Sequence, residues 1–206
     1  AVFFSGGPGS GKSTVVDALS LRSLGLKLVN TDKAFELGLK KAGMTLDLRG
    51  ADFDKVDPIR AKAKKVTARG MDMYIDGRLG LIFDTTSANL SKVKQYKEML
   101  DKIGYESKMI HVSTSLEFAQ KRNAERPRKL PPEIVEKDWK TSTKNMIALQ
   151  RIFKGDFLSV SNNDDLKSLQ DKANKLYSKL MTWTTSFPSN KPALKWRETE
   201  LQSKKT

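Results

Sequence analysis

A glycine-rich loop near the N-terminus restricts the possible folds of this chain more than any other feature. Residues Gly6 to Ser13 read Gly-Gly-Pro-Gly-Ser-Gly-Lys-Ser and match the pattern G-x-x-x-x-G-K-[S/T] at every defined position. The β-prone run 1–4 precedes the loop, and apolar residues recur at helical spacing after Lys12. Strand, phosphate-binding loop and helix in this order predict an α/β fold.

The residue types of the loop indicate its chemistry. Glycines let successive N–H groups point inward at phosphate oxygens, and the following helix adds its positive end. We expect Lys12 to contact the β and γ phosphates of ATP and the Ser13 hydroxyl to bind Mg²⁺. The residues expected to bind the nucleotide are Gly7, Gly9, Ser10, Gly11, Lys12, Ser13 and Thr14.

Strand and helix patterns alternate along most of the chain. Four more strands are predicted at 26–30, 81–83, 108–112 and 157–160, with helices at 34–41, 92–103 and from about Asp164 to Thr182. This alternation predicts a doubly wound parallel sheet of about five strands of the P-loop NTPase type.

Two segments interrupt the alternation, and a tail follows it. We expect a helical substrate-binding insertion at about 49–76 and a helical lid at about 116–140. Both belong to one kinase domain over 1–183, because 206 residues suffice for one such domain. The segment 184–206 contains two prolines and mixed charge, and we expect a C-terminal tail that is poorly ordered or docks as an arm.

Composition excludes several kinds of site. The chain has no cysteine and a single histidine, His111, so any metal must be a hard cation on oxygen ligands. His111 lies in the apolar run 108–112, and we expect it to be structural. No apolar run of about twenty residues is present, so we expect no membrane span and a cytoplasmic protein, in the host cytoplasm if a phage encodes it.

Two aspartates follow predicted strands, where ligands of such sheets bind. Asp32 is the candidate general base, because transfer to a hydroxyl requires a carboxylate that accepts the proton. Asp84 is the candidate for orienting the Mg²⁺ ion or holding the acceptor. Either residue could instead cap the helix that follows it.

Basic residues between the fourth and fifth predicted strands form the candidate lid. Arg122 and Arg126 are four residues apart, so on a helix they share one face and could close over the phosphates. A solvated basic helix end is the alternative. Lys33 and Arg128 are further candidates for contacting the acceptor.

The remaining sequence separates a kinase from other P-loop proteins. No Asn-Lys-x-Asp guanine-reading motif is present. Thr85 and Thr86 follow Asp84 where an ATPase motor usually places a water-activating Glu. We therefore interpret the chain as a kinase.

Four stretches together resemble the polynucleotide kinase and zeta toxin group of P-loop kinases: 6–14, 29–32, 83–89 and 122–128. The resemblance covers roughly residues 1–160. It implies that Asp32 is the general base, that Asp84 lies near acceptor and metal, and that Arg122 and Arg126 hold phosphates. Many members carry an Arg shortly after the base, whereas this chain has Lys33-Ala34-Phe35, which leaves the acceptor open.

Charge favours nucleic acid, most plausibly DNA, as the acceptor. The formal net charge is +14, and residues 55–78 contain seven Lys or Arg against three Asp. Spread cations bind a phosphate backbone through counterion release, although they could also serve solubility alone. The candidate hydroxyls are a 5′ end or a hydroxymethylated pyrimidine base, and phage kinases of hydroxymethyluracil in DNA resemble this type. Phe35, Tyr74 and Trp139 are then candidate stacking partners, with core packing as the alternative.

Two other functions stay open at this point. A zeta toxin-like kinase would phosphorylate a nucleotide sugar or another small nucleotide. A DNA-stimulated ATPase would release phosphate without transferring it to the DNA. The sequence does not determine the oligomeric state.

Overall fold

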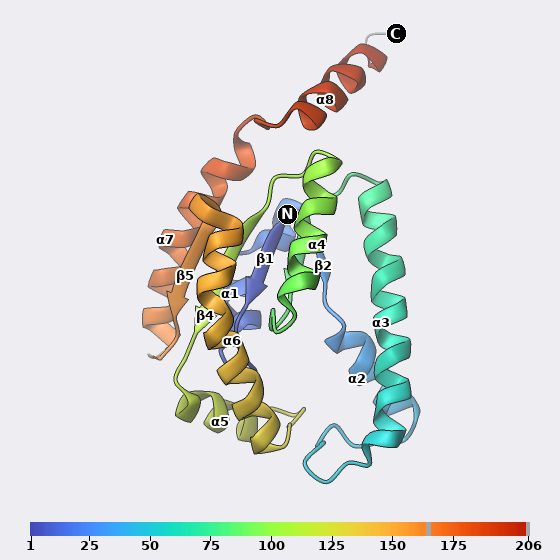
Figure 1. The fold of residues 1–206 in the computed structure, drawn as a ribbon, viewed down its shortest axis with the longest axis vertical. Coiled ribbons are helices and arrows are strands. Elements are labelled where there is room, and N and C mark those ends of the chain that lie inside the picture. Colours follow the sequence, from blue (N-terminus) through green and yellow to red (C-terminus); the bar gives the residue numbers. More distant parts are fainter. Residues whose placement is uncertain (164–165, 205–206) are drawn as a thin grey trace.

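One sheet of five parallel strands forms the centre of the molecule (Figure 1). The computed structural model describes the backbone of residues 1–163 and 166–204. The strand order is β2-β3-β1-β4-β5, which confirms the predicted parallel sheet. The strands are β1 (Val2–Ser5), β2 (Lys27–Val29), β3 (Leu81–Asp84), β4 (Lys108–Ser113) and β5 (Phe157–Ser161).

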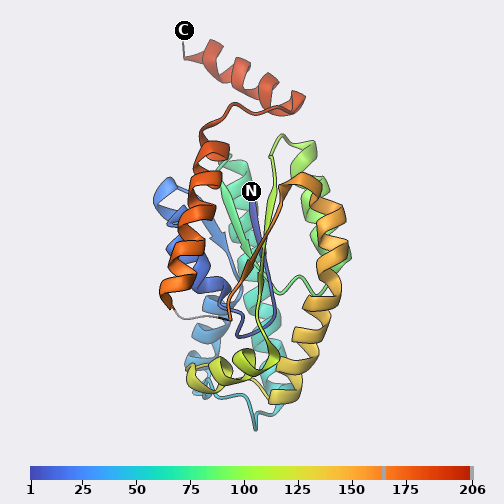
Figure 2. The same cartoon turned by 90° about the vertical axis from the view of Figure 1, so that its left-hand side faces the viewer.

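Helices cover both faces of the sheet (Figure 2). The helices α1 (Lys12–Ala18) and α7 (Leu166–Thr185) pack on one face, and α4 (Leu90–Lys102) and α6 (Pro132–Phe153) pack on the other. Successive side chains of a strand point to opposite faces, so the fully buried β1 contributes to both cores. Burial on both faces explains why the central strands β1 and β3 consist of continuous apolar runs, whereas the edge strands β2 and β5 are partly exposed. Two short 3₁₀ turns complete this body, η1 (Leu21–Leu24) and η2 (Lys154–Asp156).

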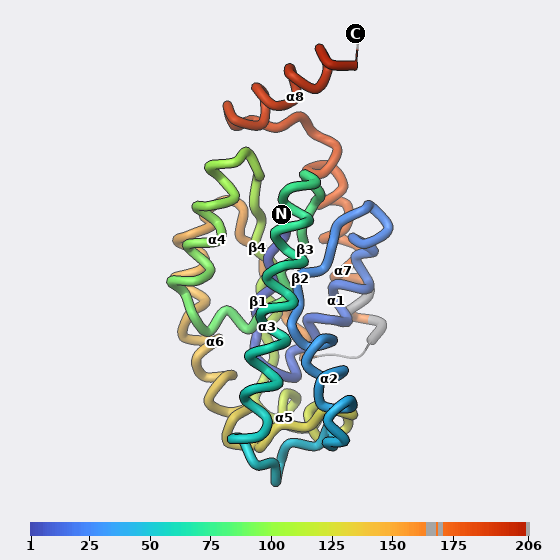
Figure 3. The backbone as a smooth tube through the Cα atoms, turned by 90° about the vertical axis from the view of Figure 1, so that its right-hand side faces the viewer, coloured from blue at the N-terminus to red at the C-terminus, as the bar shows by residue number. Residues whose placement is uncertain are grey.

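The helices α2 (Asp32–Lys41) and α5 (Leu116–Glu125) lie beyond the carboxyl ends of the strands together with the first part of α3 (Phe53–Asp76), whose last turns run back along the sheet and pack on its core. Helix α3 is the predicted insertion, and it runs alongside α2 (Figure 3). Insertion and lid, which the sequence suggested as two separate elements, share a third apolar cluster. The Leu48 N–H donates to the Lys129 carbonyl at 2.9 Å, and the Lys129 N–H donates to the Leu46 carbonyl at 3.2 Å. The lid loop is therefore docked on the segment that connects α2 to α3.

The C-terminal segment, for which the sequence suggested a tail that is poorly ordered or docks as an arm, contains a helix, α8 (Lys191–Ser203). The Asn190 amide donates to the Gly104 carbonyl at 3.1 Å, and the Ser189 hydroxyl donates to Glu106 at 2.8 Å. Helix α8 projects at the end of the molecule opposite α5, away from the carboxyl ends of the strands (Figures 1 and 2). Asp164, where the preceding helix was expected to begin, lies outside the described residues.

None of the helices among residues 1–163 and 166–204 combines the length and the apolar character needed to cross a bilayer.

Candidate active site

The glycine-rich loop is packed tightly between α5 and the end of β5. Gly9 has φ +74°, and a Cβ added there would lie 2.3 Å from the Ala119 carbonyl oxygen. Gly11 has φ +86°, and its Cβ would lie 2.1 Å from the Asn162 Nδ2. Both positions therefore need glycine for conformation and for space. The Asn162 amide also donates to the Ser10 carbonyl at 2.7 Å, which holds the loop from the side of β5.

Lys12 lies over the loop. Its Nζ donates to the Gly6 carbonyl at 2.8 Å and to the Gly7 carbonyl at 3.1 Å. Burial lowers the pKa of Lys12, while the nearby Asp84 and Asp32 carboxylates raise it. The Lys12 ammonium is thus held beside both the loop that would bind the phosphates of a nucleotide and the two carboxylates.

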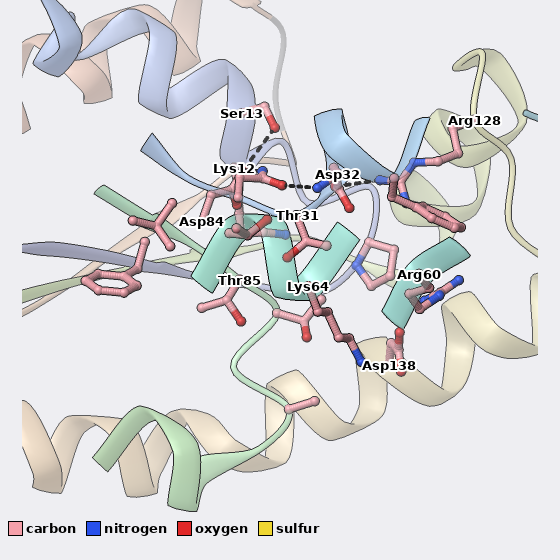
Figure 4. A pocket seen from close by; sticks show the side chains of 18 of the residues that line it. Lys12, Ser13, Thr31, Asp32, Arg60, Lys64, Asp84, Thr85, Arg128 and Asp138 are labelled. Carbon is pink, nitrogen blue, oxygen red and sulfur yellow. Dashed lines mark hydrogen bonds and ion pairs between the residues drawn. The ribbon is translucent and has the colours of Figure 1, made fainter. Parts of the chain in front are cut away.

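Asn30 connects the Asp84 carboxylate to the backbone of Asp32. Its Nδ2 donates to the Asp84 Oδ2 at 2.7 Å, and its Oδ1 accepts from the Asp32 N–H at 2.6 Å. Asp32 is the first residue of α2, and the N-cap is Thr31. Asp84 ends β3, and the N-cap of the following α4 is Asn89. Neither aspartate therefore acts as a helix cap, and both line the cleft (Figure 4).

The oxygen atoms beside Lys12 suit a magnesium ion. The Ser13 Oγ donates to the Asp84 Oδ2 at 3.4 Å. Mg²⁺ uses one or two carboxylates together with waters and substrate phosphates, so this hydroxyl and carboxylate fit it. No group of three or more His, Cys, Asp or Glu that could hold a metal alone occurs within the described part of the chain.

The two candidate lid arginines differ in their surroundings. Arg126 follows the end of α5 in extended conformation, so the expectation of one shared helix face was wrong. The Arg122 guanidinium donates to the Asn162 carbonyl at 2.9 Å and lies 3.4 Å from the Gly9 carbonyl oxygen. Arg122 thus fastens the loop to β5. The Arg126 Nε is buried without a hydrogen-bond partner, although its Nη2 donates to Asn123 at 3.1 Å.

Arg128 forms ion pairs with two acidic residues of α2. It contacts the Oδ2 of Asp32, and its Nε donates to Glu36 at 3.0 Å. The Asp32 side chain nevertheless remains 52% exposed. Lys33 is exposed and lines a smaller hollow of about 340 Å³ on the other side of Asp32, so the structure does not bring it to the main cleft.

A cleft of about 1020 Å³ opens from the loop between α3 and α6. Gly9, Gly11, Lys12, Ser13 and Thr14 line it. Of the other predicted loop residues, Gly7 packs against Trp139, and the Ser10 side chain is buried.

Three cleft residues were not singled out from the sequence. Arg60 and Lys64 of α3 line the cleft together with Asp138 of α6 (Figure 4). The spacing of four residues between Arg60 and Lys64 could have indicated a common face. Burial raises the pKa of Asp138, whereas Arg60 lowers it. Asn162 was also missed, and no sequence pattern points to it.

The aromatic candidates for base stacking are buried or partly buried. Phe35 is 2% exposed, Tyr74 packs against the core cluster that includes Phe3 and Phe83, and the Trp139 Nε1 donates to the Thr114 carbonyl at 2.7 Å. The cleft lining includes Phe35, whose ring lies under the Arg60 guanidinium, but neither Tyr74 nor Trp139. His111 is buried in β4, as expected, and its Nδ1 shares a hydrogen bond of 2.7 Å with the Ser5 hydroxyl.

Comparisons with known proteins agree with this architecture. The sequence profile described as "AAA domain" matches residues 2–149. No curated protein matches the sequence. A proposed kinase from Chloroflexus aurantiacus j-10-fl has a similar structure, with a TM-score of 0.58 and 16% identity over 84% of this chain and 96% of its own.

Two further solved structures share the fold. A gluconokinase from Sinorhizobium meliloti 1021 gives a TM-score of 0.52 and 14% identity over 90% of this chain and 97% of its own. A chain of the AvrRxo1-ORF1:-ORF2 complex solved with ATP gives a TM-score of 0.58 and 12% identity over 78% of this chain. This chain covers only 54% of the length of that chain. At these identities the likeness establishes a P-loop kinase-type fold.

Proposed function

The chain belongs to the AAA domain family, and from this premise we propose that it is a kinase which transfers the γ-phosphate of ATP to a hydroxyl on nucleic acid. The preferred acceptor is a hydroxymethylated pyrimidine base in DNA or a 5′-hydroxyl end. The kinase domain is residues 1–183, and the enzyme acts in the cytoplasm, where ATP and nucleic acid meet.

One observation carries the proposal: a phosphate-binding loop and an accessible carboxylate face the same cleft. Lys12 and Ser13 line one part of it, and Asp32 lines the adjoining part. Asn30 fixes the backbone of Asp32 relative to the Asp84 carboxylate, and Arg128 contacts the Asp32 carboxylate itself, so both contacts orient the proposed base before a substrate arrives.

Each residue then has a defined task in the transfer. Asp32 accepts the proton of the acceptor hydroxyl as its oxygen attacks the γ-phosphorus, and the bond from that phosphorus to the bridging oxygen of ADP breaks. Lys12 and Arg126 stabilise the charge on the phosphate oxygens. Ser13 and Asp84 would hold Mg²⁺, which neutralises phosphate charge when it is bound.

Charge beside the cleft supports an anionic polymer as acceptor. Residues 60–69 of α3 include five basic side chains and no acidic one. The cleft volume of about 1020 Å³ suits one nucleotide unit rather than an intact duplex. An end or an extruded base is therefore the part of the polymer that enters.

A kinase of a small nucleotide or nucleotide sugar is the second candidate, because the same volume would admit such a molecule whole. A DNA-stimulated ATPase is the third, because the loop and the Mg²⁺ ligands alone suffice for hydrolysis.

The test is transfer of γ-labelled phosphate from ATP with Mg²⁺ to four acceptors. These are hydroxymethyluracil-containing duplex DNA, ordinary duplex DNA with 5′-hydroxyl ends, single-stranded DNA and UDP-N-acetylglucosamine. We expect label in DNA, and expect Asp32→Asn to abolish it, whereas Asp72→Asn, an exposed change of equal charge on α3, leaves it intact. Label on the sugar nucleotide alone would refute the nucleic-acid acceptor, and label on none would refute the kinase.

A further inference from the structure

We propose that Arg60 and Lys64 of α3 form an anion subsite for a phosphate group of the acceptor. This inference rests on the kinase function proposed above and specifies its substrate class. The enzyme would select alcohols that carry a phosphate near the reacting hydroxyl, as a nucleotide unit does, over neutral nucleosides and polyols.

The face of α3 that carries these residues is part of the cleft wall. Residues that line the cleft recur along the helix in steps of three or four, as one helical face requires. They are Phe53, Asp57, Arg60, Lys64, Thr67, Ala68 and Met71. Asp32 and Asp84 line the same cleft, so an acceptor that reaches the base also meets the basic side chains of α3.

Arg60 is held in place yet lacks a hydrogen bond at its inner nitrogen. Its guanidinium carbon lies 4.7 Å from the centre of the Phe35 ring, and Phe35 follows Asp32 by one turn of α2. The Arg60 Nε is buried and has no hydrogen-bond partner. Its ion pair with Asp57 measures 4.0 Å, which is too long for a hydrogen bond.

A buried N–H group without a partner is costly, so the Arg60 side chain is held by its packing rather than by hydrogen bonds, and its exposed part, 35% of the side chain, faces the cleft. The planar guanidinium binds two phosphate oxygens at once, and stacking on Phe35 fixes its orientation beforehand. Lys64 lies one turn further along α3 and adds a second positive charge from the same wall (Figure 4).

The lid adds positive charge to the same cleft. Arg126 lines it, and the Arg126 Nε is buried without a hydrogen-bond partner. Burial, and then the charge of Arg128, lower the pKa of Arg126. Arg126 is assigned above to the phosphates of ATP, so on the opposite wall Arg60 and Lys64 are the cations that would meet a phosphate of the acceptor.

Asp138 is the acidic group that faces Arg60 from α6 (Figure 4). Burial raises its pKa, so a negative charge at this position is itself unfavourable. The positive side chains around it, Arg60, Lys64 and Lys12, outnumber it. The Asp138 carboxylate therefore does not take the place of a bound phosphate as the counter-charge of Arg60.

The experiment compares 5-hydroxymethyl-2′-deoxyuridine with its 3′-phosphate as acceptors of labelled phosphate. Both offer the base hydroxymethyl and the 5′-hydroxyl, so the 3′-phosphate is the only difference. For the wild-type protein we expect kcat/KM for the 3′-phosphate to be at least about tenfold higher, which corresponds to one charge-assisted hydrogen bond.

Matched variants assign the effect to the cleft face of α3. Arg60→Gln should remove most of this preference and Lys64→Gln part of it, with the KM for ATP unchanged. Arg69→Gln and Lys65→Gln, exposed residues of the same helix, should retain it. Equal use of both acceptors by the wild type, or equal preference in Arg60→Gln and wild type, would overturn the subsite.

A binding measurement separates this inference from the kinase proposal. Equilibrium dialysis of the 3′-phosphate without ATP requires no chemistry, and Arg60→Gln should bind it at least about tenfold more weakly than the wild type does. If no acceptor is labelled but this difference is found, the kinase function fails and the anion subsite stands. If the two proteins bind it equally, the subsite is refuted whatever the transfer assay gives.

Discussion

The single histidine links acidification to the stability of the sheet that carries the phosphate-binding loop. His111 is 3% exposed, and its Nδ1 shares a hydrogen bond with Ser5, the residue before Gly6. Burial, followed by the charge of Lys12, lowers the pKa of His111 from 6.5 to about 4. We predict that the protein loses stability when this imidazole is forced to accept a proton.

The size of the loss follows from the two pKa values. The unfolded chain binds the proton below pH 6.5 and the folded protein only below about pH 4, so stability falls as the pH falls through this window. At about 1.4 kcal/mol per pH unit the full window is worth about 3 kcal/mol, of which about 2 kcal/mol falls between pH 7 and pH 5.

Urea unfolding at a series of pH values measures this loss, and His111→Gln serves as the control because glutamine does not titrate. The difference between the two proteins should follow the stated window. Since the chain has one histidine, its ring-proton NMR signals also give the folded pKa directly. An identical pH dependence in both proteins, or a folded pKa at or above 6.5, would refute the reasoning.

Three further changes test the site. Asn162→Ala leaves the Ser10 carbonyl without its partner, so unfolding free energy should fall by about 1–3 kcal/mol and ATP titration should show weaker binding; unchanged values would mean that Asn162 does not hold the loop. Gly9→Ala places a Cβ 2.3 Å from the Ala119 carbonyl oxygen, and an ATP affinity less than about tenfold weaker would contradict this packing. Asp138→Asn removes a carboxyl group whose pKa is raised by burial, so that its ionisation costs stability as the pH rises. The variant should therefore be more stable than the wild type in denaturant unfolding at pH 7, and a lower stability would exclude this account.

The sequence predicted the sheet and the phosphate-binding loop because both depend on local patterns. Apolar runs buried on both faces mark the strands, and the spacing from Gly6 to Ser13 specifies the turn that the structure shows. Asp32 and Asp84 could be proposed because residues at strand ends meet at one edge of a parallel sheet.

Other parts of the site depend on contacts between distant segments. Asn162 donates a hydrogen bond to Ser10, which lies 152 positions away in the sequence, and no local pattern predicts that bond. Arg122 and Arg126 have a helical spacing, yet α5 ends at Glu125, so the two side chains do not share one helical face. Arg122 donates a structural hydrogen bond to the Asn162 carbonyl, whereas the Arg126 Nε has no hydrogen-bond partner. In the sequence Arg60 resembles the other charges of α3, and its position over Phe35 in the cleft wall distinguishes it from Lys62 and Lys65.

A single-turnover experiment tests the central claim most directly, with enzyme in excess over γ-labelled ATP and the DNA substrate in excess over both. The label is then divided between DNA and free phosphate. The account predicts that the wild-type protein places most of the label in DNA and that Asp32→Asn loses this transfer. Release of nearly all label as free phosphate, at the same rate in both proteins, would contradict it and identify an ATPase.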